Sequence, residues 1–284
     1  MQENEEYWDL IIKPKGKWYQ VDLGAIWLYR DLLMLLVRRD FISVYKQTIL
    51  GPVWFFIQPV ITTITFTIIF GSLAKISTDG VPPMLFYLSG ITLWTYFADC
   101  LNKTSNTFVA NAAVFGKVYF PRLIVPLSVL ISNLIKLLIQ FVLFLSVWTF
   151  YLLQDNSFTP NWGLIWLLPI LVIMMAGLGL GFGILISSLT TKYRDFTFLI
   201  GFGVQLMMYA SPVVYPMSIV PEKYKFWLLL NPVTSIIEAF KYLFLGHGYF
   251  NWTTLGFSAT FMLLLLALAI LVFNKVEKSF MDTV

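Results

Sequence analysis

The chain has little charge, one cysteine and one histidine, and each shortage excludes a class of function. Charged residues make up 12% of the 284 residues, whereas soluble domains carry roughly 25%. With 58% hydrophobic residues, this is the composition of an integral membrane protein. Cys100 alone cannot form an internal disulfide or a cysteine-based metal cluster. His247 alone argues against a multi-histidine metal site, so we expect no metal site.

The sequence also lacks nucleotide-binding and catalytic signatures. No G-x-x-x-x-G-K-[ST] motif occurs, so the chain does not bind ATP through a P-loop. An excess of 19 Lys/Arg over 15 Asp/Glu suits juxtamembrane positive charge better than a nucleic-acid interface. One enzyme candidate is His247 with Glu238 and Lys241 upstream. We favour a polar turn before the last apolar stretch, and predict no catalytic residue.

Six stretches reach or approach the roughly 20 apolar residues that a membrane span requires. The interval 214–250 before the last one holds two short apolar segments, each too short to cross and bordered by Pro, Gly or charge. We therefore predict an all-α membrane protein with six transmembrane helices and two short re-entrant or external helices between spans five and six. The fifth span is short, and its boundaries are the least defined. The six stretches are 52–74, 83–101, 123–152, 163–188, 197–213 and 252–274.

The N-terminal segment, residues 1–51, precedes a transmembrane domain of residues 52–284. Asp22 to Thr48 is predicted to be a helix that ends before Gly51-Pro52. Its apolar residues recur at three- and four-residue spacing and so share one face. Such a helix is too charged to span and is typical of an amphipathic helix in the membrane interface. The apolar face is Ile26, Tyr29, Leu33, Leu36, Val37 and Val44; Asp31, Arg38, Arg39 and Lys46 lie opposite.

The distribution of Lys and Arg predicts the orientation. The segments 1–51, 102–122, 189–196 and 275–284 hold 14 of the 19 (seven, three, two and two). Positive residues concentrate on the cytoplasmic side, and the first fifty residues are too polar for a signal peptide. Both termini are therefore predicted to be cytoplasmic.

Polar and aromatic residues inside the spans allow two readings each. Asn133, Lys136 and Gln140 share one helical face, because they are spaced i, i+3 and i+7. This face forms either part of a polar translocation path or a hydrogen-bonded cluster between helices, since a lysine in lipid costs at least about 2.5–3.5 kcal/mol. Many rings in the first two spans could stack on sugars, or belong to the interfacial belt. They are Trp54, Phe55, Phe56, Phe86, Tyr87, Trp94, Tyr96 and Phe97.

The fourth span carries a series of glycines at every second position. The series contains two overlapping G-x-x-x-G pairs, which permit close approach of helices. A lone glycine motif is weak support for a nucleotide role, so we predict helix packing. The glycines are Gly177, Gly179, Gly181 and Gly183.

Four local patterns, in the family's order, resemble the permease subunit of ABC-2 type transporters that export O-antigen and related polysaccharides. KVYFPR and the segment containing Asn231-Pro232 are the most specific, and the resemblance covers nearly the whole chain. Residues 1–20 lie outside it. The patterns are LLVRRDFISVYKQTILGPVWFFIQPV (35–60), NAAVFGKVYFPRLIVPLSVLISNLI (111–135), TTKYRDF (190–196) and SPVVYPMSIVPEKYKFWLLLNPVTSIIEAFKYLFLG (211–246).

The resemblance implies a division of labour between this chain and a separate ATPase. The segment from about Asn106 to Phe120 would be a cytoplasmic coupling helix docked in a groove of the ATPase, its aromatics packing there. The loop 190–196 would be a secondary contact. ATP and Mg would bind to the partner, and this chain would need no cofactor. The implied coupling residues are Phe108, Val114, Phe115, Lys117, Tyr119, Phe120, Pro121, Arg122, Tyr193 and Arg194.

The resemblance further implies a homodimer with two ATPase subunits in a bacterial inner membrane, exporting a polysaccharide carried on undecaprenyl diphosphate. Arg38 and Arg39 would meet the diphosphate, or anchor to anionic lipid headgroups. Two alternatives are an ABC-2 permease for drugs or small lipids, and a stand-alone channel or membrane enzyme. The expected substrate path is Arg38, Arg39, Trp54, Phe55, Tyr87, Trp94, Asn133 and Lys136. The expected external gate is Pro212, Tyr215, Asn231 and Pro232.

Overall fold

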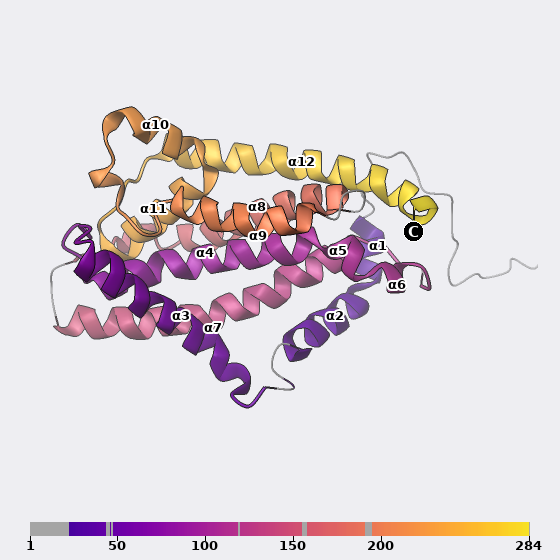
Figure 1. The fold of residues 1–284 in the computed structure, drawn as a ribbon, viewed down its shortest axis with the longest axis horizontal. Helices are drawn as coiled ribbons and strands as arrows, with labels where there is room; N and C mark the ends of the chain where they lie inside the picture. The colour runs from indigo at the N-terminus through magenta and orange to yellow at the C-terminus, as the bar shows by residue number, and fades with distance from the viewer. Residues whose placement is uncertain are drawn as a thin grey trace, which may run out of the picture.

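The structure is a computed structural model that describes residues 23–43, 46, 48–118, 120–154, 158–190 and 195–283, with side chains up to Val276. Within these ranges every regular element is a helix, and the longest helices run along the long axis of the molecule (Figure 1). The elements are α1 Leu23–Leu28, α2 Arg30–Ser43, η1 Gly51–Val53, α3 Trp54–Phe66, η2 Thr67–Leu73, α4 Pro83–Ser105, α5 Thr107–Ala110, α6 Ala112–Phe115, α7 Ile124–Gln154, η3 Trp162–Leu164, α8 Leu167–Thr190, α9 Phe196–Tyr209, η4 Met217–Ile219, α10 Glu222–Leu230, α11 Pro232–Leu245 and α12 Trp252–Thr283.

Five helical segments in the described chain are long and apolar enough to cross a membrane, which confirms the all-α membrane fold. Each overlaps a predicted span. A sixth crossing is counted if the bent pair α10 and α11 is taken as one span. The five segments are Gly51–Leu73, Pro83–Ser105, Ile124–Gln154, Leu167–Thr190 and Trp252–Val276.

The fifth predicted span, 197–213, is shorter in the structure than expected. α9 has 14 residues, about 21 Å at 1.5 Å per residue, against a hydrocarbon thickness of about 30 Å. The helix ends at Tyr209, and residues 210–214 form a turn. Pro212 explains this end, because proline lacks an N–H and disfavours helical geometry in the residue before it.

The two short helices predicted between spans five and six are present as α10 and α11. Their axes differ by 104°. The break lies at Asn231, whose backbone is extended, and Pro232 opens α11, the position where a missing N–H costs no hydrogen bond. α10 has no buried residue, whereas 13 of the 14 residues of α11 are buried.

The glycine series forms the tightest contacts of the bundle. α8 packs on α4 along one side and on α12 along another. A Cβ added at Gly179 would lie 2.8 Å from Cys100 Cβ on α4, and one at Gly183 would lie 2.5 Å from Thr104 Cβ. Gly177 and Gly181 meet α12 in the same way. The prediction of helix packing is confirmed, with two glycines on each of two faces.

The N-terminal helix is present as α1 and α2. Backbone hydrogen bonds from Tyr29 N to Ala25 O (3.2 Å) and from Leu33 N to Tyr29 O (3.0 Å) continue the helical path between them. Leu36 and Val37 are buried, as the apolar face predicts, and α2 packs on α7. Val44 lies outside the described residues.

Candidate functional site

The segment between α4 and α7 forms a short hairpin, residues 107–118 and Phe120, at one end of the bundle (Figure 1). Its rings point inward. Phe108 stacks on Phe273 of α12, with ring centroids 4.8 Å apart, and Phe115 packs on Phe120 at 5.7 Å. These four rings belong to a buried cluster that also includes Leu36, from α2. The hairpin is therefore fixed to α2 and α12 through its aromatic residues.

This arrangement corrects one expectation about the coupling residues. Phe108, Phe115 and Phe120 were expected to pack in a partner's groove, but all three are buried in this chain. The large apolar rings take the inner side of the hairpin because their burial removes more apolar surface from water than burial of the smaller valines would. Tyr119, Tyr193 and Arg194 lie outside the described residues.

The outward side of the hairpin carries smaller apolar residues and a lysine. Val109, Val114 and Val118 are 47%, 42% and 58% exposed, and Lys117 is exposed. Val114 and Lys117 were predicted as contact residues, whereas the similarly exposed Val109 and Val118 were not among the predicted residues. Helices of four residues are too short for periodicity to assign a face, so the sequence held no signal for these two valines.

Pro121 and Arg122 link the hairpin to α7, and both are half-buried. The Arg122 guanidinium lies 5.5 Å from the centre of the Phe115 ring, within the range of a cation–π contact. Arg122 thus holds the turn closed from the outside, while the rings hold it from the inside.

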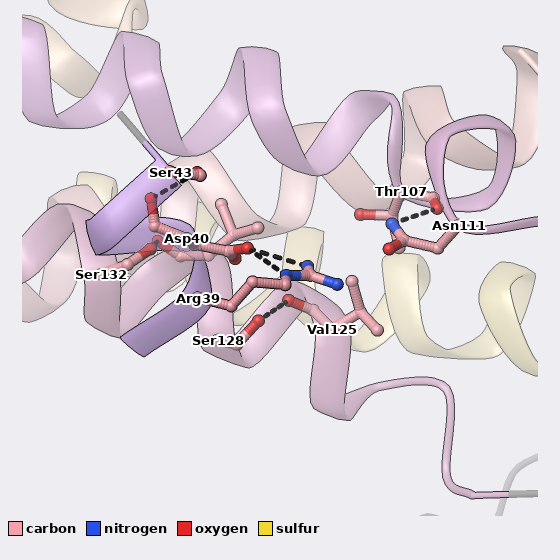
Figure 2. Close-up of polar contacts among 9 residues, drawn as sticks. Arg39, Asp40, Ser43, Thr107, Asn111, Val125, Ser128 and Ser132 are labelled. Atoms are coloured by element: carbon pink, nitrogen blue, oxygen red, sulfur yellow. Dashed lines mark hydrogen bonds and ion pairs between the residues drawn. The ribbon is translucent and has the colours of Figure 1, made fainter. Parts of the chain in front are cut away.

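The two arginines of α2 differ in what they contact. Arg39 donates from Nε and Nη2 to Asp40 Oδ1, at 2.9 and 2.8 Å. Figure 2 shows this pair beside the first turns of α7, which carry Val125 and Ser128. Arg38 is exposed and makes no ion pair with a described residue. Of the two predicted diphosphate contacts, Arg38 is thus the one whose charge is not already paired.

The polar face of the third span joins α7 to α4. Lys136 Nζ lies 2.6 Å from Asp99 Oδ2, and Lys103 Nζ donates to Asn133 Oδ1 at 2.9 Å. The structure thus contains the predicted cluster between helices, and a role of Asn133 and Lys136 in a translocation path stays a prediction. Asp99 and Lys136 keep 27% and 17% of their side-chain surface exposed, so the pair lies at the edge of the interface. The sequence did not indicate Asp99 as the partner, because that depends on the register of two helices.

Most of the aromatic residues predicted along a substrate path are packing residues in this chain. Tyr87 and Trp94 lie on α4 and are buried in the hydrophobic core of the protein. Phe55 is buried against Phe41, with ring centroids 5.6 Å apart. These three cannot face a channel in the conformation described. Trp54 is exposed. For Tyr87 and Trp94 the reason is that α4 is buried on most of its sides, so its sequence does not show which rings face outward.

The four predicted gate residues meet at the other end of the bundle, between α9 and α11. The Asn231 side chain caps α11 by accepting from Val233 N at 3.1 Å. Its Nδ2 donates to Ser211 Oγ at 2.9 Å. Pro212 and Pro232 are buried, and Tyr215 donates to Tyr209 O at 3.1 Å. The grouping of these residues agrees with the prediction, and their role in gating stays a prediction.

The segment around His247 is a turn. Gly246 ends α11 with φ +69°, and Gly248 has φ +141°, both in the region that favours glycine. His247 is half-buried and makes no hydrogen bond with a described residue. No group of three or more His, Cys, Asp or Glu side chains suited to a metal occurs in the described part of the chain.

These features define a class. The protein is a multi-pass helical membrane protein with a compact hairpin at one end and a bent pair of short helices at the other.

The chain belongs to the ABC-2 type transporter family, whose model matches residues 31–245. It is similar to the O-antigen export system permease protein RfbA of Klebsiella pneumoniae, at 26% identity over 89% of this chain and 94% of that protein. RfbA of Myxococcus xanthus is 23% identical over 91% of this chain and 97% of that protein. The polysialic acid transport protein KpsM of Escherichia coli is 21% identical over 82% and 89%.

Proposed function

We propose that this chain is the channel-forming permease of an ATP-driven exporter that moves a lipid-linked polysaccharide, such as O-antigen, across the bacterial inner membrane. The observation that carries the proposal is family membership together with relatives named for O-antigen export that align along nearly their whole length. KpsM, named for polysialic acid transport, supports polysaccharide as the substrate class.

ATP hydrolysis belongs to a separate subunit in this proposal. The chain has no P-loop motif, and the hairpin offers a surface for a partner. Three exposed valines and Lys117 form that surface, and we define Val109, Val114, Val118 and Lys117 as the hairpin face. It would dock on an ATPase that binds ATP and Mg.

Movement of the hairpin would reach the spans through the buried rings. The cluster that contains Phe108 and Phe115 also holds residues of α2, α7, α8 and α12, among them Ile184 and Phe273. Close-packed interiors transmit displacement because they are hardly compressible. A push on the hairpin face would therefore shift these four helices together.

The channel would form between two copies of the chain. α9 is an apolar helix in which two residues, Ile200 and Val204, are buried, and Phe198, Leu199 and Phe202 are exposed. A Cβ added at Gly201 or Gly203 meets no described atom within 4 Å. Small residues at such a face allow another helix to approach closely, which suits a second copy.

The orientation follows from charge. The segments that carry 14 of the 19 Lys/Arg include the hairpin and the C-terminal end of α12, and both lie at the same end of the bundle (Figure 1). The positive-inside rule makes this end cytoplasmic. α10 and α11, at the opposite end, would form the external gate.

At the cytoplasmic mouth, Arg38 is the better candidate for a diphosphate contact, because Arg39 is occupied by Asp40. The exposed indole of Trp54, at the start of the first span, would offer a stacking face for sugars. Anchoring of Arg38 to anionic lipid is the competing role.

Deletion and complementation in the source bacterium test the proposal. Deletion should abolish the surface polysaccharide and cause lipid-linked glycan to accumulate inside the cell, and a plasmid copy should reverse both effects. Normal surface glycan in the deletion strain, or accumulation of a drug or a small lipid instead, would contradict the assigned substrate. A drug-efflux assay in parallel identifies the alternative.

A further inference from the structure

Two charged side chains lie enclosed in α11, at the end of the bundle opposite the hairpin. Glu238 and Lys241 are three residues apart, and each keeps 1% of its side-chain surface exposed, with 3.6 Å between Lys241 Nζ and Glu238 Oε1. Taking two charges out of water carries a desolvation penalty that their attraction often fails to recover. Stability alone is therefore a weak account of the pair.

The contacts of Lys241 reach two other segments. Its Nζ donates to the carbonyl of Pro212, in the turn that ends α9. The same atom lies 3.7 Å from the centre of the Phe86 ring on α4. One ammonium group thus joins α11 to the end of α9 and to the first turn of α4.

Glu238 reaches a third segment. Its Oε2 accepts from the backbone N–H of Tyr249 at 2.8 Å, in the turn that leads to α12. Gly248 is packed so closely here that an added Cβ would lie 2.9 Å from the Glu238 carbonyl oxygen. The carboxylate therefore fixes the start of α12 while it balances the charge of Lys241.

The turn held by Lys241 is itself enclosed. Val213 is fully buried, and an added Cβ at Gly90 of α4 would lie 3.0 Å from the Val213 carbonyl oxygen. Asn231 adds two weaker ties to the same turn, to Ser211 Oγ and to Ala210 O. The turn 210–214 is thus fastened from α11 at two places, and only one of them uses charge.

We propose that the Glu238–Lys241 pair is a latch that holds the turn 210–214 on α11, so that α9 and α11 move as one body. A charge-assisted hydrogen bond is stronger than a neutral one in a site without water. Because neither charge can stay buried without the other, Glu238 and Lys241 would release the turn together. The latch would transfer motion of α9 to the bent pair, which the proposed function assigns to the external gate.

The test measures exposure of the turn with a cysteine at Val213. The background is Cys100→Ala, which removes the native thiol, with Val213→Cys as reporter and a membrane-impermeant maleimide as probe. Glu238→Gln with Lys241→Met removes both charges and leaves neither unpaired, which avoids the large penalty of a single buried charge. We expect labelling to become at least about tenfold faster in this double variant. Equal rates in the two backgrounds would overturn the latch.

Two controls make the result specific. Asn231→Ala removes the neutral ties and keeps the pair, and we expect labelling within about threefold of the parent. An acceleration as large as that of the double variant would show that any loosening frees the turn, and would refute the special role of the pair. Lys223→Cys, exposed on α10, reports folding and sidedness.

The side of labelling separates this inference from the proposed function. The probe is added from whichever side labels Lys223→Cys, so the latch is tested even if that side is cytoplasmic, which would contradict only the proposed orientation. Hydrogen exchange on the unmodified chain covers the case where the double variant does not fold. The Val213 amide should exchange as slowly as those of α11, and exchange about tenfold faster or more would contradict the latch.

Discussion

The two ends of the bundle place their large side chains in opposite ways. At one end, the hairpin of α5 and α6 turns Phe108 and Phe115 inward and leaves valines outside. At the other end, α10 turns Phe226 and Trp227 outward, while α11 is enclosed with two charges inside it. The hairpin thus presents small apolar side chains on a fixed support, which suits the partner surface proposed above. The bent pair instead contains an enclosed helix that polar contacts fasten to its neighbours. Both ends pack on the same closely packed helices, α4, α8 and α12.

The largest expected effect comes from breaking the shared packing. Gly183→Leu would place a side chain where even a Cβ lies 2.5 Å from Thr104 Cβ. α4 and α8 could then not approach, and we expect loss of nearly all monodisperse protein in detergent, as measured by size-exclusion chromatography.

Gly256→Leu is the matched control, since Gly256 also lies in a long apolar helix and an added Cβ there meets no described atom within 4 Å. Its yield should stay within about twofold of the parent. A normal yield for Gly183→Leu would show that the helix contact is not required.

The next largest effect is expected at the hairpin end of the bundle alone. Phe108→Ala removes a fully buried ring that stacks on Phe273, and such truncations cost about 3–5 kcal/mol. We expect the hairpin to loosen, and both ATPase co-purification and glycan export to be lost.

We expect the end of the bundle that carries α10 and α11 to be unaffected by Phe108→Ala. Labelling of Lys223→Cys on α10 should be unaltered in Phe108→Ala, because the ring belongs to a cluster at the hairpin end. A changed labelling rate would mean that the two ends unfold together, and the comparison would fail.

A smaller structural effect with a specific functional loss is expected on the hairpin face. Val114→Asp and Val118→Asp alter exposed side chains, so stability should change by less than about 0.5 kcal/mol. An apolar contact with the ATPase would be lost, and co-purification should fall at least about tenfold.

Val114→Thr is the control, because it keeps the shape of the side chain and replaces one methyl group with a hydroxyl. Its co-purification should fall by less than about threefold. Undiminished ATPase binding in both aspartate variants would show that the hairpin face does not contact the ATPase.

The smallest expected effect distinguishes the two arginines of α2. Arg38→Ala removes an exposed cation, and export should fall by about three- to tenfold if it contacts a diphosphate. Arg39→Ala breaks a surface pair with Asp40, worth about 0–1 kcal/mol, and should lower export by less than about threefold. Export is measured as surface glycan at equal protein level; equal losses would favour the anchoring role.

How far the sequence determined these features depends on the length of each pattern. Long apolar runs predicted five of the helices, and glycines at every second position predicted the packing of α8. The rings at Tyr87 and Trp94 were misread because α4 is enclosed on most sides. A helix of this kind has no polar face to show which way each ring points.

The orientation of short helices and the pairings between helices could not be predicted from the sequence. The inward rings of α5 and α6 could not be assigned, since four residues give no period. The Asp99–Lys136 pair depends on the register in which α4 and α7 pack. The hydrogen bond from Lys241 to Pro212 depends on where the chain turns after α9. Such features follow from tertiary packing, which no local pattern records.

Photo-crosslinking in living cells shows directly whether the ATPase docks on the hairpin end of the bundle. A photoreactive phenylalanine analogue replaces Val118 on the hairpin face or Trp227 on α10, both of which are exposed. We expect a crosslink to an ATPase with Walker motifs from position 118 and none from position 227. A crosslink to that ATPase from position 227, or its absence from position 118 in cells that export normally, would contradict this docking.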